Sequence, residues 1–443
     1  MVPIDSTTHD LTSNHELRNC FQNTNRTRRP DDASTQSTST SVSKTPILKM
    51  FACGYSFFIS GVNDGTLGPL IPYILNSFKI STGQVAYIYA CTFVGWITAL
   101  PINPVLVNYL PLGLILALGA ALQLLGQFMR PWGPLPLYSV SFFFCGLGMA
   151  VQDSHANTFV SSAKVAHIWL GFIHASYAAG LAVGPIISTA LASKEENIGG
   201  VASWKATYYA LIGLNALNVA GTFFAFQDSL RHKQAGQDVV EIPERKAVAM
   251  HELKRSIKCW SLWAISMAFF LQLGAMMTAS GWVVEFLTKV RGGDLKKMGY
   301  VPTGCNAGIL LGRIVLAEPI HRLGEQSTIL ASFVLTLAFQ LVFWLVPDII
   351  GSAVALALMG FFSGPFFPVG IAVSSKLFPR EIRSTALGFI FVLAQAGAAL
   401  FPSITGLVAQ KAGVQVLQPI VTALLVLGGL FWWRVPNVRE IEL

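Results

Sequence analysis

Gly61–Tyr73 reads GVNDGTLGPLIPY and lies inside the first of many long apolar segments of the chain. The surrounding segment, residues 48–75, is long enough to cross about 30 Å of hydrocarbon as a helix. Asp64 falls near the middle of this helix, where a carboxyl group is costly unless it has a partner or faces a water-filled cavity. The segment therefore predicts a membrane-spanning helix that carries a functional polar site.

The composition of the whole chain also indicates a membrane protein. Of its 443 residues, 53% are hydrophobic and 12% are charged, whereas roughly 25% of the residues of soluble domains are charged. So few charges could not cover the water-facing surface of a chain this long. The net charge of +8 does not indicate nucleic-acid binding, because Lys and Arg cluster in short connections between apolar segments.

Twelve membrane-spanning helices are predicted, six on each side of a polar stretch. The first six cover residues 48–75, 84–108, 112–130, 136–162, 166–192 and 203–227. The second six cover residues 259–288, 299–317, 326–346, 349–376, 383–410 and 414–434. Glycine and proline interrupt corresponding helices of both sets, as expected of an alternating-access transporter. The predicted fold is thus an all-α membrane protein made of two six-helix halves.

The predicted organisation has a disordered cytoplasmic tail, an N-terminal half, a cytoplasmic linker, a C-terminal half and a short cytoplasmic tail. These parts cover residues 1–46, 47–228, 229–258, 259–435 and 436–443. The first tail is rich in Ser, Thr and Asn and has no apolar periodicity. Both termini are predicted to be cytoplasmic, because this orientation places most of the 30 Lys and Arg residues on the inner side.

This orientation assigns several charged residues to the outer side. Arg130 is counted among the outer connections, because it is the last residue of the third predicted helix. Glu285, Lys289 and Arg291 lie at the outer end of the seventh predicted helix, where we expect them to be solvated.

Several segments resemble the major facilitator superfamily in their order and spacing. They are Gly61–Tyr73, Val151–Asn157, Gly312–Ile314, Ala317–Pro319, Gly397–Pro402 and Val416–Pro419. Within the superfamily, residues 48–436 are most similar to the fungal fucose-permease-like transporters, including the bypass-of-stop-codon group. The resemblance implies a central cavity lined by helices 1, 4, 7 and 10. The connection Leu100–Leu110 departs from the family pattern, because it lacks the charged motif usual after the second helix.

Asp64 and Asp153 are the predicted proton-coupling residues. Burial in a membrane favours the neutral form of a carboxyl group, so each could carry a proton reversibly. Asn157 shares a face of the fourth helix with Asp153, and Asn63 adjoins Asp64. Sugar symporters of the fucose-permease type are similar in using carboxylates on helices 1 and 4. Alternatively, Asp64 is a structural residue satisfied by Asn63, and Asp153 lies at the membrane interface.

Four more polar side chains at membrane depth are candidates for the same site. His174 and Tyr177 on the fifth helix offer donors to the cavity or a proton relay, although a helix–helix contact explains them equally well. Gln272 and Gln395, on helices 7 and 11, could bind substrate hydroxyl groups or hold helices together. At the position that corresponds to Asp153, the tenth helix carries aromatic residues, which predict an aromatic wall.

Charged residues at the cytoplasmic ends of helices 8 and 11 form a predicted gate. Salt bridges among them would hold the inner side shut and break when the halves move; alternatively, the charges only set the topology. The residues of this predicted gate are Arg313, Glu318, Arg322 and Arg383.

The fifth helix offers a competing functional indication. Gly171, Gly180, Gly184 and Pro185 resemble the antiporter motif of drug and metabolite exporters. Small residues and a proline permit close helix packing and a kink, which many membrane helices need. The motif therefore favours export without establishing it.

The combined prediction is a secondary active transporter that moves a small solute, with a sugar-like molecule as first candidate, by proton-coupled alternating access. A drug or metabolite efflux antiporter and a non-transporting nutrient receptor are the alternatives. No zinc-ligand spacing, phosphate-binding loop or nucleophile motif is present, so neither an enzyme nor a bound metal or cofactor is expected. The expected partners are the solute, protons and the lipid bilayer, for a monomer in the plasma membrane.

Overall fold

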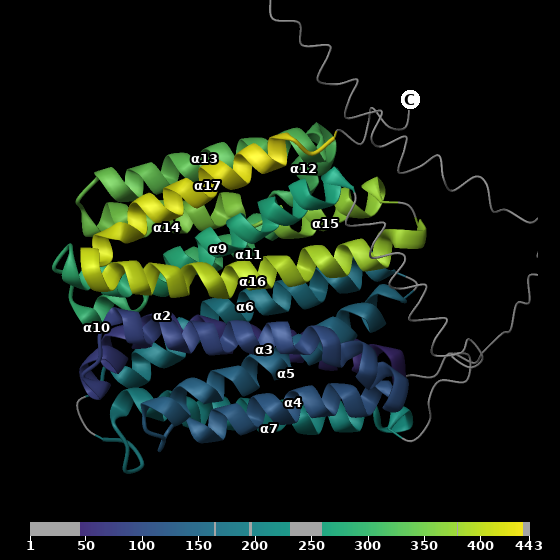
Figure 1. Cartoon of the computed structure of the whole chain (residues 1–443), viewed down its shortest axis with the longest axis horizontal. Coiled ribbons are helices and arrows are strands. Elements are labelled where there is room, and N and C mark those ends of the chain that lie inside the picture. The colour runs from purple at the N-terminus through teal and green to yellow at the C-terminus, as the bar shows by residue number, and fades with distance from the viewer. Residues whose placement is uncertain (1–44, 164, 195–196, 231–258, 379, 437–443) are drawn as a thin grey trace, which may run out of the picture.

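The computed structural model describes residues 45–163, 165–194, 197–230, 259–378 and 380–436 (Figure 1). The predictions for the tail 1–46 and the linker 229–258 fall almost wholly outside these residues, as does the prediction for the tail 436–443. Within the described residues, long helices form nearly all the regular structure. The prediction of an all-helical chain is confirmed.

The N-terminal half consists of six long helices and two short 3₁₀ turns. The long helices are α2 (Thr45–Phe78), α3 (Thr82–Tyr109), α4 (Leu112–Met129), α5 (Leu135–Ser161), α6 (Ala166–Ala192) and α7 (Thr207–Ala225). The 3₁₀ turns are η1 (Ser203–Ala206) and η2 (Gln227–Ser229). Pro111 and Pro134 directly precede α4 and α5, positions at which a missing backbone N–H group costs nothing.

The C-terminal half repeats this arrangement with more interruptions. Its elements are α9 (Trp260–Lys289), α10 (Leu295–Met298), α11 (Val301–Val315), α12 (Ala317–Leu323), α13 (Glu325–Leu345), α14 (Ile349–Ser363), α15 (Phe366–Leu377), α16 (Arg380–Ala412), η3 (Val414–Val416) and α17 (Leu417–Trp433). In the described residues, ten helical segments are long and apolar enough to cross a membrane. Neither α2, which carries the polar stretch around Asp64, nor the 15-residue α11 is among them.

One predicted helix is broken in the structure. Residues 349–376 form α14 and α15, which are separated at Gly364–Pro365. Pro368 has no N–H group to donate to the carbonyl of Gly364, four residues earlier. This free carbonyl instead accepts a hydrogen bond from Arg313 Nε at 3.2 Å, so the break ties α11 to the tenth predicted helix.

The two halves pack side by side with their helices roughly parallel (Figure 1). The contacts between them are mainly α3 against α16 and α6 against α11, with a smaller contact of α2 with α9. Within the halves, α2 packs most extensively on α6, and α9 on α16. Among the helices that meet between the halves, α2, α6, α9, α11 and α16 carry predicted site residues.

Pro185 supports the contact between the halves. It lies inside α6 and cannot donate to the carbonyl of Leu181 in the preceding turn. That carbonyl accepts a hydrogen bond of 2.8 Å from Asn306 Nδ2 of α11. Pro185, predicted to be a packing residue, thus also leaves the Leu181 carbonyl free to accept a hydrogen bond from the opposite half.

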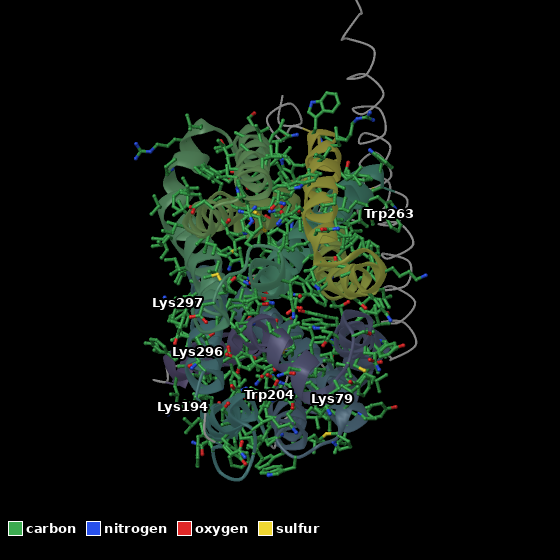
Figure 2. The ribbon with its side chains drawn as sticks, turned by 90° about the vertical axis from the view of Figure 1, so that its left-hand side faces the viewer. Lys79, Lys194, Trp204, Trp263, Lys296 and Lys297 are labelled. Carbon is green, nitrogen blue, oxygen red and sulfur yellow. The ribbon has the colours of Figure 1, made fainter. Side chains whose placement is uncertain are left out.

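The halves meet tightly at the end of the bundle where α2 and α9 finish, which we call the far end. A side chain at Gly68 of α2 would place its first carbon 2.9 Å from the backbone oxygen of Ser280 of α9. Ser403 Oγ of α16 donates to the backbone oxygen of Ala86 of α3 at 2.9 Å. The far end also presents exposed lysines from both halves, namely Lys79, Lys194, Lys296 and Lys297 (Figure 2). The two halves are therefore in contact just inside this charged face.

The opposite end, where α2 begins, carries an ion pair within the N-terminal half. Lys49 Nζ lies 2.6 Å from Asp228 Oδ2 and 5.4 Å from the centre of the Phe226 ring. The hydrogen bond from Lys49 lowers the pKa of Asp228, which lies in η2 after the last helix of this half. This contact joins the beginning of the half to its end.

The glycines predicted to pack helices divide into two groups. Gly180 and Gly184 of α6 lie against α2: a first side-chain carbon at Gly180 would contact the backbone oxygen of Phe58 and lie 2.9 Å from the nitrogen of Val62. Gly171, in contrast, has open space where a side chain would begin. Two of the three glycines of the exporter-like motif thus have a packing role in this structure.

Gly180→Val is expected to destabilise the protein by about 1–3 kcal/mol, because α2 and α6 would have to move apart. The measurement is the unfolding temperature of the purified protein in detergent. Gly171→Val, on the same helix but in open space, is the matched control and is expected to leave this temperature nearly unchanged. Equal effects of the two substitutions would contradict the packing role.

The prediction that Glu285 is solvated is wrong, and Arg130 also proves to be buried. Arg130, counted among the outer connections, is fully buried at the end of α4. Glu285 is only 3% exposed, and Arg291 donates to backbone carbonyls in the last turn of α13, including that of Phe343 at 2.6 Å. Only Lys289 of the three residues at the end of α9 is exposed as expected. Each was assigned from its position at a helix end, where side chains can also turn inward to pack.

Candidate functional site

Two adjoining cavities lie between the halves. The first, which we call the Asp64 cavity, has a volume of about 60 Å³. The second, the Asp153 cavity, has a volume of about 80 Å³. Leu181, Met277 and Gln395 line both cavities and separate them. Both volumes are large enough for a few water molecules, so polar groups that face them need not be satisfied by protein alone.

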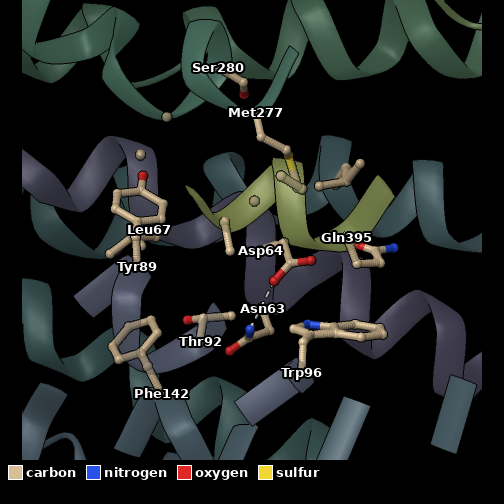
Figure 3. Close-up of a pocket in the computed structure, with 16 residues that line it drawn as sticks. Asn63, Asp64, Leu67, Tyr89, Thr92, Trp96, Phe142, Met277, Ser280 and Gln395 are labelled. Atoms are coloured by element: carbon tan, nitrogen blue, oxygen red, sulfur yellow. Dashed lines mark hydrogen bonds between the residues drawn. The ribbon is translucent and has the colours of Figure 1, made fainter. Parts of the chain in front are cut away.

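Asp64 lies at the centre of the first cavity, with Tyr89 on one side and Trp96 and Gln395 on the other (Figure 3). Asn63 Nδ2 donates to Asp64 Oδ1 at 3.2 Å. The hydroxyl group of Tyr177 on α6 donates to Asp64 Oδ2 at 2.8 Å. Each oxygen of the carboxyl group therefore has one protein donor, and the group still faces the cavity.

Tyr177 connects the two cavities. Its hydroxyl group is bonded to Asp64 in the first cavity, and the residue also lines the second. The relay predicted for Tyr177 is geometrically available, since a phenol can both donate and accept a hydrogen bond. His174, its predicted partner, packs edge-on against Phe57 and lies 5.2 Å from the Phe367 ring. His174 thus lines the Asp153 cavity as part of an aromatic wall.

Asp153 is 3% exposed and lines the second cavity. Ser60 Oγ on α2 lies 3.3 Å from Asp153 Oδ1 and is its donor. Asn157, one turn further along α5, is half-buried and is not among the residues that line these two cavities. The predicted polar stripe therefore reaches the site only at Asp153.

The C-terminal half contributes neutral polar groups, one cation and aromatic rings to the Asp153 cavity. Gln272 Nε2 donates to Ser363 Oγ at 2.8 Å, and its buried Oε1 atom has no donor in the described part of the chain. Phe366 and Phe367 line the cavity, as the predicted aromatic wall requires, and none of the residues lining it from this half is acidic. An unpaired amide oxygen is an acceptor for a solute hydroxyl group.

Arg313 differs in its surroundings from the rest of the predicted gate. It lines the Asp153 cavity, and its Nη1 atom donates to the backbone oxygen of His174 on α6 at 2.7 Å. This bond joins the two halves. Arg383 donates to the backbone oxygen of Phe378 at 3.3 Å, Arg322 is exposed, and the side chain of Glu318 lies outside the described residues. The structure brings Arg313, but not Arg383, to the central site.

Under the proton-coupling role predicted for Asp64, Tyr177→Phe is expected to raise by about one unit the pH at which solute flux falls to half. The substitution removes a donor that stabilises the ionised carboxylate, so Asp64 would keep its proton to higher pH. The measurement is the pH profile of solute flux in vesicles. Tyr89→Phe is the matched control, because Tyr89 lines the same cavity. A shift of the same size in the control, or none in Tyr177→Phe, would contradict the prediction.

The fold and its central polar cavities define a multi-pass membrane transporter, and comparison with known proteins agrees. The chain belongs to the Major Facilitator Superfamily, whose sequence profile matches residues 54–357 and 320–442. Members of this family are transporters rather than enzymes.

Two relatives and one solved structure illustrate the likeness. The chain is 24% identical over 419 residues to bypass of stop codon protein 6 of Saccharomyces cerevisiae, covering 88% of this chain and 82% of the relative. It is 27% identical over 287 residues to the cis,cis-muconate transport protein of Acinetobacter baylyi, covering 62% and 66%. The fold is shared with the Escherichia coli fucose:proton symporter at a TM-score of 0.63 and 15% identity, over 89% of this chain and 100% of that chain.

Proposed function

We propose that this transporter is a proton-coupled secondary carrier of a small solute and works by alternating access. The carrying observation is the position of Asp64: a carboxyl group on α2 faces a cavity between the two halves, and both of its oxygens accept hydrogen bonds from uncharged donors. An ionisable group at this depth is expected to take part in transport. The fold shared with a fucose:proton symporter supports the proposal.

The proposed topology has twelve membrane spans with both termini in the cytoplasm. In it, α2 and the pair α11–α12 supply the two spans additional to the ten long apolar segments. The far end is then the outer end, and the contacts at Gly68 and Ser403 correspond to a carrier closed to the outside. We propose that the carrier is a monomer, since the two halves of one chain together complete the central site. We also propose that it lies in the plasma membrane.

The substrate class follows from the Asp153 cavity. Aromatic rings from α15 and α16 and the free acceptor of Gln272 suit a compact molecule with an apolar face and a hydroxyl group. A sugar-like solute meets this description. The relative that transports cis,cis-muconate makes small organic acids the second class to examine, and Arg313 at the cavity is a suitable cation for a carboxylate.

The test is flux in vesicles that contain the purified chain and a pH-sensitive dye. Sugars and small organic acids are screened one at a time, with and without an imposed pH gradient. Solute movement accompanied by protons in the same direction supports the proposed symport. Movement in the opposite direction to protons would indicate the efflux antiporter, and solute flux that ignores the gradient would overturn proton coupling. Solute binding without flux in folded protein would favour a receptor.

A further inference from the structure

Arg130 is a buried cation, and none of the roles predicted from the sequence requires its burial. Its side chain is fully buried at the end of α4, and the guanidinium carbon lies 3.8 Å from the centre of the Phe142 ring. Nε donates to Ser141 Oγ at 3.1 Å, and Nη1 donates to Gln127 Oε1 at 2.9 Å. Among the residues that the structure describes, the Nη2 atom has no acceptor. The cation is thus held by neutral groups and a ring face.

A buried cation requires a compensating negative charge nearby. Removing a guanidinium from water costs several kcal/mol, which neutral hydrogen bonds alone do not return. Within the described residues, no carboxylate lies within 4.0 Å of Arg130. The compensating charge must therefore act from beyond direct contact.

One side chain connects Arg130 to an acid. Asn63 Oδ1 accepts hydrogen bonds from both Arg130 Nη1 and Gln127 Nε2, each at 2.9 Å. These two donors fix the orientation of the amide, so its NH₂ group points the other way and donates to Asp64 Oδ1. A cation on the carbonyl side polarises an amide and strengthens the donation on the opposite side. Arg130, Asn63 and Asp64 are therefore joined in one polarised series of hydrogen bonds.

The other titratable and charged groups around these three residues lie on several helices. Cys145 on α5 is buried, and its Sγ accepts from Gln127 Nε2 at 3.6 Å. The hydroxyl groups of Tyr138 on α5 and Tyr208 on α7 bond to each other beside the Arg130 guanidinium. Tyr177 on α6 donates to Asp64, and Tyr89 on α3 lines its cavity. Asp153 and Arg313 line only the second cavity, and the C-terminal half contributes no charged residue to the first. The carboxyl group connected to Arg130 by hydrogen bonds is that of Asp64.

We propose that Arg130 is the fixed counter-charge of Asp64 and acts on it through the Asn63 amide. The proposal rests on the proposed function, in which Asp64 binds and releases a proton in every cycle. Burial between helices favours the neutral form of a carboxyl group, so Asp64 would otherwise tend to keep its proton. The positive charge of Arg130 stabilises the Asp64 carboxylate that remains after the proton has been released. Arg130 is therefore a positioning residue, which acts on Asp64 through Asn63 and allows the carrier to exist without a bound proton.

The test measures protonation of Asp64 directly and requires no substrate. The infrared carbonyl band of protonated carboxyl groups is followed against pH in the purified full-length protein, and the contribution of Asp64 is the part absent in Asp64→Asn. Arg130→Gln is expected to raise the midpoint of this contribution by about one pH unit, because a nearby opposite charge is lost. Arg130→Lys keeps the charge and is expected to restore most of the original midpoint.

Gln127→Leu is the matched control. It removes the second donor to the same oxygen of Asn63 and one acceptor of Arg130, but it removes no charge, so the midpoint is expected to move by less than in Arg130→Gln. Equal shifts in Arg130→Gln and Gln127→Leu would assign the effect to amide geometry rather than charge and would overturn the proposal. So would an unchanged midpoint in Arg130→Gln, or an Asp64 contribution that does not titrate.

Failure of Arg130→Gln to fold would also be decisive when combined with a second variant. If Arg130 balances the charge of Asp64, the double variant Arg130→Gln/Asp64→Asn removes both charges and is expected to recover a monodisperse protein. A double variant that folds no better than Arg130→Gln would overturn the proposal. The infrared result and vesicle flux are independent: a shifted midpoint without proton-driven flux would refute the proposed function and leave the Arg130–Asp64 interaction standing.

Discussion

Replacing Asp64 with asparagine is expected to reduce solute accumulation driven by a pH gradient to the background level of empty vesicles. Asparagine has nearly the same shape as aspartate and can still accept from Tyr177, but it cannot bind and release a proton. Exchange of labelled for unlabelled solute at equal pH is expected to continue, because exchange requires movement of the loaded carrier only. The measurement is a pair of assays, driven uptake and exchange, on the same preparation.

Asp153→Asn is the matched comparison for this prediction. Asp153 lines the adjoining cavity and accepts only from Ser60 in the described residues, so its loss is expected to alter solute affinity while driven uptake remains measurable. Driven uptake that survives in Asp64→Asn would remove Asp64 from the coupling role. Survival there combined with loss in Asp153→Asn would transfer the role to Asp153.

Gly68→Val is expected to lower net transport at least about tenfold without unfolding either half. The first side-chain carbon would lie 2.9 Å from the Ser280 oxygen and 3.2 Å from Gly281 Cα, so α2 and α9 could not close together. A carrier that cannot close its far end loses one of the two states that alternating access requires. The measurements are flux in vesicles and the reactivity of an introduced cysteine at Ser280 toward a membrane-impermeant thiol reagent.

The control for the closure prediction is Gly213→Val on α7, where a side chain would meet open space. It is expected to transport normally and to leave the labelling of the Ser280→Cys background unchanged. In Gly68→Val, labelling from the far-end side is expected to rise. Transport at the original rate in Gly68→Val would show that the contact between α2 and α9 is dispensable.

The helical architecture was predictable because each segment carries its own signal. Apolar length and connecting polar residues located the helices to within a few residues, and the resemblance to the superfamily supplied their order. The break between α14 and α15 was visible as Gly364–Pro365, yet a glycine–proline pair inside an apolar segment is equally compatible with a continuous kinked helix. Its consequence, a free carbonyl that binds Arg313, depends on a neighbouring helix that local sequence does not identify.

The candidate site was predictable where polarity interrupts an apolar helix, as at Asp64, Asp153 and Tyr177. Arg130 was missed because it follows the last apolar residue of α4 and precedes a proline–tryptophan pair, as residues of exposed connections often do. A signal for its burial was present: Gln123, Gln127 and Arg130 have the spacing of one helix face. Gln123 contacts Gln152 on α5, and Gln127 contacts Asn63 on α2. A polar stripe that ends in a cation indicates an inward-facing side chain.

The separation of the two cavities by Leu181, Met277 and Gln395 has an evolutionary consequence. Under the proposed assignment, the hydrogen-bonded residues Arg130, Asn63 and Asp64 all lie in the N-terminal half, whereas the second cavity takes three of its aromatic rings from the other half. Substitutions at Phe366 or Phe367 can therefore change which solute fits and leave the energy-coupling residues intact. Such modularity would let descendants of one ancestral carrier acquire new nutrients or metabolites while inheriting the same proton chemistry.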